Sequence, residues 1–308
     1  MTGAGGRSGP EDSGPAGGLA GRGLPQGPGE PGLPTPRTAE GRAGLAWILA
    51  EPGRALIATD FDGTLAPIVA DPAAASAHPA AAPALRALAG QVGTLAIITG
   101  RPALTAVELG GFGGIPGLIV LGQYGWEQWQ DGQLTAPPPP PGVATARAEL
   151  PTLLARAVGA EGAWVEDKGY ALAVHTRRAA DPAAALHKVA DPLAGLARRT
   201  GLQLEPGRLV LELRPGGTDK GTALTGLVAE RRCRAILFAG DDLGDLAAFA
   251  AVRELRAAGH PGLTVCSGSA EVTELAAEAD LVVDGPGQVT ALLAALARAV
   301  SGSPRPAR

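Results

Sequence analysis

Two aspartates separated by one residue, Asp60 and Asp62, have types and a spacing that suggest chemistry. Carboxylates this close repel each other unless a cation or a shared proton lies between them. Magnesium meets this need, because it prefers carboxylate oxygens and retains several of its water molecules. Gly63 follows directly, and a glycine lets the backbone turn sharply and approach a ligand closely. The residue types in this segment therefore predict a loop that holds a metal ion.

An apolar run at residues 55–58 leads into this loop and predicts a buried strand of a parallel sheet. In open α/β sheets the chemistry lies beyond the carboxyl ends of the strands, where this pattern places Asp60 and Asp62. Similar apolar runs at residues 94–98 and 235–239 end in polar motifs, Thr99-Gly100-Arg101 and Gly240-Asp241-Asp242-Leu243-Gly244-Asp245. A further motif, Thr218-Asp219-Lys220-Gly221, opens a helix that is expected to run to about residue 231.

The elements that would position these motifs alternate between strands and helices, which predicts a doubly wound parallel α/β sheet. Five consecutive prolines from Pro137 to Pro141 interrupt the alternation, because proline is excluded from helix interiors and central strands. Between this break and residue 215 the pattern predicts a smaller α+β domain. Its expected elements are helices at 143–158 and 182–199 and strands at 163–166, 170–175, 202–205 and 208–213.

The domain organisation follows from these changes in pattern. Residues 1–42 are Gly- and Pro-rich and are predicted to be a disordered tail, because they bury too little apolar surface to offset the entropy of ordering. Residues 43–135 and 216–302 are assigned to the main domain, 136–215 to the inserted smaller domain, and 303–308 to a C-terminal tail. Neither a signal peptide nor a membrane span is expected.

The composition is that of a soluble protein. The 308 residues carry a formal net charge of −4, which gives no electrostatic reason to expect nucleic acid or an anionic membrane as a partner. Two cysteines, Cys233 and Cys266, are too few for a disulfide framework, so a reducing compartment, the cytoplasm, is expected. The sequence leaves the oligomeric state open, with a monomer as the working prediction.

The segment Asp60-Phe61-Asp62-Gly63-Thr64-Leu65 resembles the first motif of the haloacid dehalogenase superfamily of aspartyl-phosphate phosphatases. The resemblance implies a Rossmann-like core with an inserted cap domain and a Mg²⁺ cofactor. It also implies that Asp60 attacks phosphorus, that Asp62 acts as general acid and base, that Thr99 binds a phosphoryl oxygen, and that Lys220 neutralises charge. The implied metal ligands are Asp60, Asp62, Asp241, Asp242 and Asp245.

The predicted cap carries motifs similar to those of trehalose-6-phosphate phosphatases: Glu166-Asp167-Lys168, His175-Thr176-Arg177 and Glu212-Leu213-Arg214-Pro215. They follow Gly122-Gln123-Tyr124-Gly125-Trp126-Glu127 in the family's order, and the resemblance covers residues 43–300. It implies a magnesium-dependent hydrolysis of trehalose 6-phosphate to trehalose and phosphate, a step of trehalose biosynthesis. The substrate-binding residues it implies are Gly63, Gly100, Arg101, Glu166, Lys168, His175, Arg177 and Glu212.

Two departures from the family pattern affect these expectations. The last motif usually reads Gly-Asp-Asp-x-Thr-Asp-Glu, whereas here Gly244 and Leu246 replace the hydroxyl and the final carboxylate. The three aspartates remain, so metal binding is expected to survive while the start of the next helix is braced differently. Gln123 stands where the family has asparagine, which puts the role of that asparagine in question.

Other interpretations stay open at this point. Glu166, Lys168 and Glu212 also fit exposed strand charges, His175 and Arg177 fit structural roles, and Arg101 fits a residue that braces its own loop. Trp126 and Trp164 are expected to pack rather than to bind sugar. The alternative functions are a phosphatase for another sugar or polyol phosphate, since the core motifs carry no substrate identity, and a non-catalytic sugar-phosphate sensor.

Overall fold

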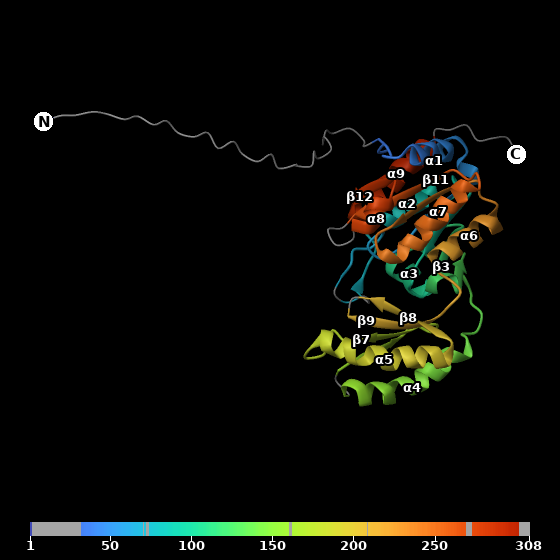
Figure 1. The fold of residues 1–308 in the computed structure, drawn as a ribbon. Helices are drawn as coiled ribbons and strands as arrows, with labels where there is room; N and C mark the ends of the chain where they lie inside the picture. Colours follow the sequence, from blue (N-terminus) through green and yellow to red (C-terminus); the bar gives the residue numbers. More distant parts are fainter. Residues whose placement is uncertain are drawn as a thin grey trace. The chain divides into compact units, whose positions relative to one another are not determined.

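The computed structural model describes residues 1, 32–69, 71, 74–159, 162–207, 209–268 and 273–301. From Leu33 onward these residues form a compact unit that contains two β-sheets, and each sheet is covered by helices (Figure 1). The larger sheet is built from the beginning and the end of the unit, and the smaller sheet from the middle.

The larger sheet, called here the core sheet, has eight strands. In spatial order they are β12 (Leu281–Asp284), β11 (Gly262–Gly268), β10 (Ala235–Gly240), β1 (Ala55–Thr59), β2 (Thr94–Ile98), β3 (Leu118–Gly122), β4 (Glu127–Gln130) and β5 (Gln133–Thr135). The first six strands in this order are parallel. At the centre, Ile57 of β1 pairs with Leu237 of β10 and Leu95 of β2. The predicted doubly wound α/β sheet is confirmed.

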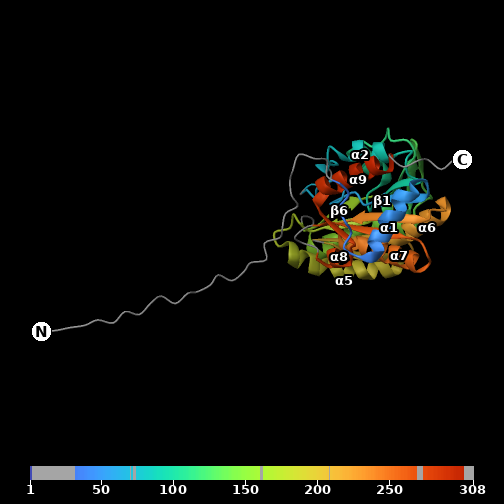
Figure 2. The same cartoon turned by 90° about the horizontal axis from the view of Figure 1, so that it is seen from above.

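Alternate residues of the central strand β1 face two different helical layers, as the period of two requires. Ala55 and Ile57 pack in one apolar cluster, and Leu56 and Ala58 in another. The first cluster includes residues of α1 (Ala39–Ala50), α2 (Ala81–Leu88), α3 (Ala103–Gly110) and α9 (Gly285–Ser301). The second includes residues of α6 (Lys220–Arg231), α7 (Leu246–Ala257) and α8 (Thr273–Glu278). Figure 2 shows α2 beside α9 on one side of β1.

The smaller sheet, called here the cap sheet, is antiparallel. Its strands in spatial order are β6 (Trp164–Asp167), β7 (Leu172–His175), β9 (Val210–Pro215) and β8 (Leu202–Gly207). Helices α4 (Pro141–Val158) and α5 (Pro182–Thr200) pack together on it and enclose a separate apolar cluster (Figure 1). The predicted domain boundaries fall at the end of β5, Thr135, and at the end of β9, Pro215.

The prediction of disorder through residue 42 is wrong for its last residues. Helix α1 begins at Ala39, and the Thr38 side chain caps it by accepting a hydrogen bond from the Gly41 N–H. Arg37 donates from its backbone to the Asp280 carbonyl and from its side chain to the Ala279 carbonyl, 2.7 Å away. The error arose because long-range bonds, rather than apolar content, order this stretch. The rest of that predicted tail, residues 2–31, and the predicted tail at 303–308 lie outside the described residues.

The antiparallel hairpin of β4 and β5 was not predicted. It extends the parallel sheet at β3, and the side chains of β5 are exposed, so the segment lacks the apolar run by which the other core strands are recognised. Two other short elements, 3₁₀ turns at Gln123–Gly125 (η3) and Leu243–Asp245 (η4), follow β3 and β10. Within the described residues, every helix is too short or too polar to cross a bilayer.

Candidate active site

Three of the predicted site residues lie at the carboxyl ends of neighbouring strands. Asp60 follows β1, Thr99 follows β2, and Asp241 follows β10, and β1 lies between the other two strands. The Asp60 N–H donates to the Ala239 carbonyl and the Thr99 N–H to the Leu121 carbonyl, so the strand pairing continues into the loops. The parallel register therefore brings together residues that are up to 181 positions apart.

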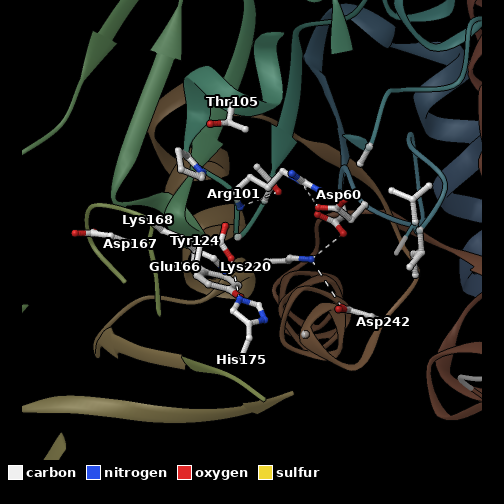
Figure 3. A pocket seen from close by; sticks show the side chains of 18 of the residues that line it. Asp60, Arg101, Thr105, Tyr124, Glu166, Asp167, Lys168, His175, Lys220 and Asp242 are labelled. Atoms are coloured by element: carbon white, nitrogen blue, oxygen red, sulfur yellow. Dashed lines mark hydrogen bonds and ion pairs between the residues drawn. The ribbon is translucent and has the colours of Figure 1, made fainter. Parts of the chain in front are cut away.

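Asp60, Asp241 and Asp245 form a buried acidic cluster in which carboxylate oxygens lie within 4.8 Å of one another. Lys220, at the first position of α6, lies against this cluster. Its Nζ is 3.1 Å from Asp60 Oδ2 and 3.9 Å from Asp242 Oδ1 (Figure 3). The same Nζ is 2.8 Å from Asp245 Oδ1. A single buried cation thus contacts the predicted nucleophile and two aspartates of the Gly-Asp-Asp loop.

The charges in this cluster are unbalanced. Burial raises the pKa of Asp60 well above its usual value in spite of Lys220, and neighbouring carboxylates add to the effect. Burial, with Asp242 and Asp245, raises the pKa of Asp241 to about 8. Burial alone would lower the pKa of Lys220, but Asp245, Asp60 and Asp242 hold it well above its usual value. Desolvated carboxylates that repel one another fit a hard divalent cation, which would keep them ionised.

Asp245 differs from the other two acids because both of its oxygens accept hydrogen bonds. Oδ1 accepts from Lys220, and Oδ2 accepts from the backbone N–H groups of Asp241, at 2.9 Å, and Asp242, at 3.2 Å. Asp242 and Asp245 also cap η4 reciprocally. These bonds brace the start of α7 in a loop that lacks the usual threonine and glutamate. The metal-ligand roles assigned to Asp60, Asp62, Asp241, Asp242 and Asp245 stay predictions.

Gly63 packs directly on Asp241. Its φ is +67°, and a Cβ added there would lie 1.8 Å from Asp241 Oδ2. The Gly63 N–H donates to the Ala66 carbonyl at 2.7 Å, and the Ser267 hydroxyl donates to the Gly63 carbonyl at 2.6 Å. Only glycine suits both the left-handed backbone and the close approach, so the loop after β1 can fold tightly over the acidic cluster.

Asp62 points to a different partner from Asp60. Arg101 Nε and one terminal nitrogen donate to its two carboxylate oxygens at 2.6 and 2.7 Å. The loop that carries Arg101 is held by the Thr99 hydroxyl, which accepts from the Arg101 N–H, and by Glu127, which accepts from the Ala103 N–H at the start of α3. Arg101 therefore orients the predicted acid–base residue, which goes beyond the bracing of its own loop.

The predicted cap residues form two hydrogen-bonded pairs. Glu166 Oε2 lies 3.0 Å from His175 Nε2, and this hydrogen bond, ahead of the nearby positive charges, lowers the pKa of Glu166. Lys168 Nζ donates to Glu212 Oε2 at 2.5 Å. Trp164 stacks on the His175 ring with a centroid separation of 4.2 Å, so it packs as expected. Of the four paired residues, Glu166 lies in β6, His175 in β7 and Glu212 in β9, and Lys168 directly follows β6.

A cavity of about 530 Å³ joins the two sets of residues (Figure 3). Its lining includes the predicted site residues Asp60, Asp62, Thr99, Gly100, Arg101, Glu166, Lys168, His175, Arg177, Lys220 and Asp242. Four predicted site residues lie outside this lining. Asp245 contacts the lining residue Lys220, and Glu212 contacts the lining residue Lys168. Asp241 lies within 4.8 Å of Asp60, and Gly63 packs on Asp241.

Tyr124 and Thr105 also line this cavity but were not among the predicted site residues. Tyr124 could have been found from its place just beyond the carboxyl end of β3, the rule that identified Thr99 and Asp241. Thr105 lies inside helix α3, where no motif marks it.

Comparisons with known proteins agree with this geometry. The trehalose-phosphatase family model matches residues 58–285. An uncharacterized glycosyl hydrolase of Mycobacterium tuberculosis is 37% identical over 216 residues, which are 65% of this chain and 15% of that protein. The trehalose-phosphate phosphatase of Mycobacterium marinum is 31% identical over 256 residues, 79% of this chain and 61% of the relative. This chain thus spans less than two thirds of the length of either relative.

A solved structure shares the fold. The C-terminal domain of trehalose-6-phosphate phosphatase from C. albicans superimposes with a TM-score of 0.66 at 23% identity, over 86% of this chain and 99% of that domain. The family match covers both sheets except residues 55–57 of β1, and it includes the residues of the acidic cluster and of the two cap pairs. The chain belongs to the trehalose-phosphatase family.

Proposed function

We propose that this protein is a magnesium-dependent phosphatase that hydrolyses trehalose 6-phosphate to trehalose and phosphate. The observation that carries the proposal is the cavity itself. Asp60 and Lys220 line it on the core side, with Asp241 next to Asp60, and Glu166 and Lys168 line it on the cap side. One side suits a phosphate monoester and the other suits hydroxyl groups. A substrate with both parts, a phosphorylated sugar, fits this division.

In the proposed reaction a carboxylate oxygen of Asp60 attacks phosphorus, and the bond between phosphorus and the sugar oxygen breaks. Asp62 gives a proton to the departing sugar oxygen, and Arg101 holds its carboxylate in place. Water then attacks the phosphorus of the aspartyl-phosphate, Asp62 takes its proton, and phosphate and the Asp60 carboxylate are released. Lys220 and the Thr99 hydroxyl stabilise charge on the phosphoryl oxygens.

Asp60 and Asp241 would hold the magnesium ion. Asp62, Asp242 and Asp245 would be further ligands or would hold the ligands in place. When bound, the ion neutralises charge on the phosphate and on the carboxylates that would otherwise repel it.

The cap supports the choice of a sugar substrate. Glu212 is buried, and among the described residues its Oε1 accepts no hydrogen bond, although its other oxygen pairs with Lys168. An unpaired buried carboxylate oxygen is costly. Glu212 does not itself line the cavity, so the role proposed for it is to hold Lys168, which faces the sugar. Lys168, with two further protons on Nζ, can donate to the same sugar.

The test is phosphate release from a panel of sugar and polyol phosphates, with magnesium and with a chelator. Trehalose 6-phosphate is expected to give the highest kcat/KM, and chelation is expected to abolish turnover until magnesium is restored. Higher kcat/KM on another phosphate would replace the substrate assignment. Binding without any turnover would identify a sensor, and full activity in chelator would contradict the metal requirement.

We further propose that the protein works in the cytoplasm on this small-molecule substrate. Cys233 and Cys266 are both buried free thiols, which suits a reducing compartment.

A further inference from the structure

Gln123, at the carboxyl end of β3, connects the core sheet to the cap. Its side-chain amide Nε2 donates to the Lys168 carbonyl at 2.6 Å, across 45 positions of sequence. The residue is 2% exposed. In the same area Trp126 stacks on Tyr170 with ring centroids 5.7 Å apart. The segment 123–126 of the core thus docks on the turn 168–170 of the cap.

The turn that accepts this bond carries Lys168, one of the predicted substrate-binding residues of the cap. The Lys168 N–H donates to the Ala171 carbonyl, and Gly169 has a φ of +86°, so the chain reverses tightly between β6 and β7. The backbone of Lys168 is therefore held on one side by the hairpin and on the other by Gln123. Its Nζ reaches Glu212.

The backbone conformation of Gln123 is unfavourable for glutamine, so another contact must stabilise the residue there. Its φ is +50° and that of Tyr124 is +58°, a left-handed conformation in which glycine and asparagine are favoured among the amino acids. Asparagine has one methylene fewer than glutamine and would hold its amide farther from the cap. The longer side chain is what spans the distance to the Lys168 carbonyl.

We propose that Gln123 is a positioning residue. It holds the Lys168–Glu212 pair over the acidic cluster and so favours substrates long enough to reach the cap. This inference rests on the proposed function for its substrate. The bond itself joins one core loop to one cap turn, and its loss would let the turn move while Asp60, Lys220 and Asp241 keep their contacts.

Two variants separate positioning from folding. Gln123→Met keeps the length of the side chain and removes the donor, and Gln123→Asn suits the left-handed backbone better but shortens the side chain. Gln133→Met, on the exposed strand β5, is the matched control. Both Gln123 variants are expected to lower kcat/KM for trehalose 6-phosphate by about three- to tenfold, the effect of losing one net hydrogen bond. Turnover of a small aryl phosphate, and the Tm of Gln123→Asn, are expected to stay at wild-type values.

Hydrogen exchange of the turn provides a measurement that needs no substrate. In both Gln123 variants the amides of residues 167–171 are expected to exchange faster than in the wild type and in Gln133→Met. If the wild type fails to hydrolyse trehalose 6-phosphate, the proposed function fails. The exchange rates alone then test whether the Gln123–Lys168 hydrogen bond holds the turn. Unchanged exchange in both variants, or equal kinetic losses on both substrates, would overturn the inference.

Discussion

At the scale of single residues, the ammonium group of Lys220 fixes the orientation of the Asp60 carboxylate. Lys220 Nζ lies 3.1 Å from Asp60 Oδ2 and is itself held by Asp245 at 2.8 Å. Both side chains are almost completely buried. The predicted nucleophile is thus oriented by a fixed cation before any ligand binds, which would avoid reorganisation during the proposed reaction.

The first prediction concerns this nucleophile. Asp60→Asn keeps the size of the side chain and removes the charge that attacks phosphorus, so turnover is expected to fall by at least about three orders of magnitude. Steady-state phosphate release checks this, with the exposed Asp284→Asn as the control. A folded Asp60→Asn protein with near-normal turnover would rule out the covalent mechanism.

The second prediction concerns Glu212, the partner of Lys168, whose side chain is only 11% exposed. Glu212→Ala removes the partner of Lys168 and a predicted sugar contact, and binding energy from such remote parts of a substrate lowers the barrier at the reacting centre. The transition-state stabilisation for trehalose 6-phosphate is expected to fall by about 1–3 kcal/mol. Activity on a small aryl phosphate should hardly change.

Comparison of kcat/KM on the two substrates checks this expectation. Glu149→Ala, an exposed ion-paired residue of α4, is the matched control in the cap. Equal losses on both substrates would assign Glu212 to folding, and no loss on either would leave it as a strand charge without a role in binding.

At the scale of elements, one buried carboxylate joins the start of α1 to α7 and β11. Asp280 accepts hydrogen bonds from the side chains of Arg256 and Thr38 and from the backbone and hydroxyl of Thr264, at 2.8 and 2.9 Å. Burial alone would raise the pKa of Asp280, but these bonds, led by that of Arg256, lower it. The carboxylate therefore contributes to stability as an anion.

The third prediction follows from that shift. Asp280→Asn is expected to lower the free energy of unfolding at pH 7 by about 1.5–3 kcal/mol, the range for hydrogen bonds to a charged group. Because the folded-state pKa lies below the unfolded value, the contribution is complete above the unfolded pKa, about 3.9, and is lost as the pH falls through the folded pKa.

Urea unfolding between pH 7 and pH 3 measures both effects. The difference between the wild type and Asp280→Asn should shrink at the acid end, whereas Asp284→Asn should follow the wild type throughout. A difference that stays constant with pH would show that the charge of Asp280 is not what stabilises the helix junction.

At the scale of the whole described unit, the core sheet and the cap sheet have separate apolar interiors. Leu193 and Val174 belong to the cap cluster, whereas Leu237 belongs to a cluster of the core. The predicted catalytic side chains come from the core, and the predicted substrate-binding residues Glu166, Lys168, His175 and Arg177 come from the cap. Damage to one interior should therefore affect the two halves of the cavity unequally.

The fourth prediction tests this division. Leu193→Ala is expected to destabilise the cap by about 2–5 kcal/mol through lost burial and a cavity. Activity on trehalose 6-phosphate should fall more than activity on an aryl phosphate, whereas Leu237→Ala should lower both together. Kinetics on both substrates, with circular dichroism as a check of folding, measures the effect. Parallel losses in Leu193→Ala would show that cap and core fold as one unit.

Local chemistry in the sequence was enough to predict most of the elements and the side chains of the core motifs. The apolar runs before Asp60, Thr99 and Asp241 mark buried parallel strands, because such strands are covered on both faces and need no polar alternation. Once those strands are parallel neighbours, their carboxyl ends must meet. The convergence of the three residues therefore follows from pattern alone.

Only the tertiary structure decided the contacts between residues that are distant in sequence. Arg37 and Thr38 are ordered by Asp280, Arg101 turns to Asp62, and Gln123 reaches Lys168. Each of these bonds requires two separate elements to be placed within about 3 Å, which no local periodicity encodes. The sequence by itself determined which residues stand at the strand ends, and the packing of distant elements, within the core and between the core and the cap, decided which residues touch.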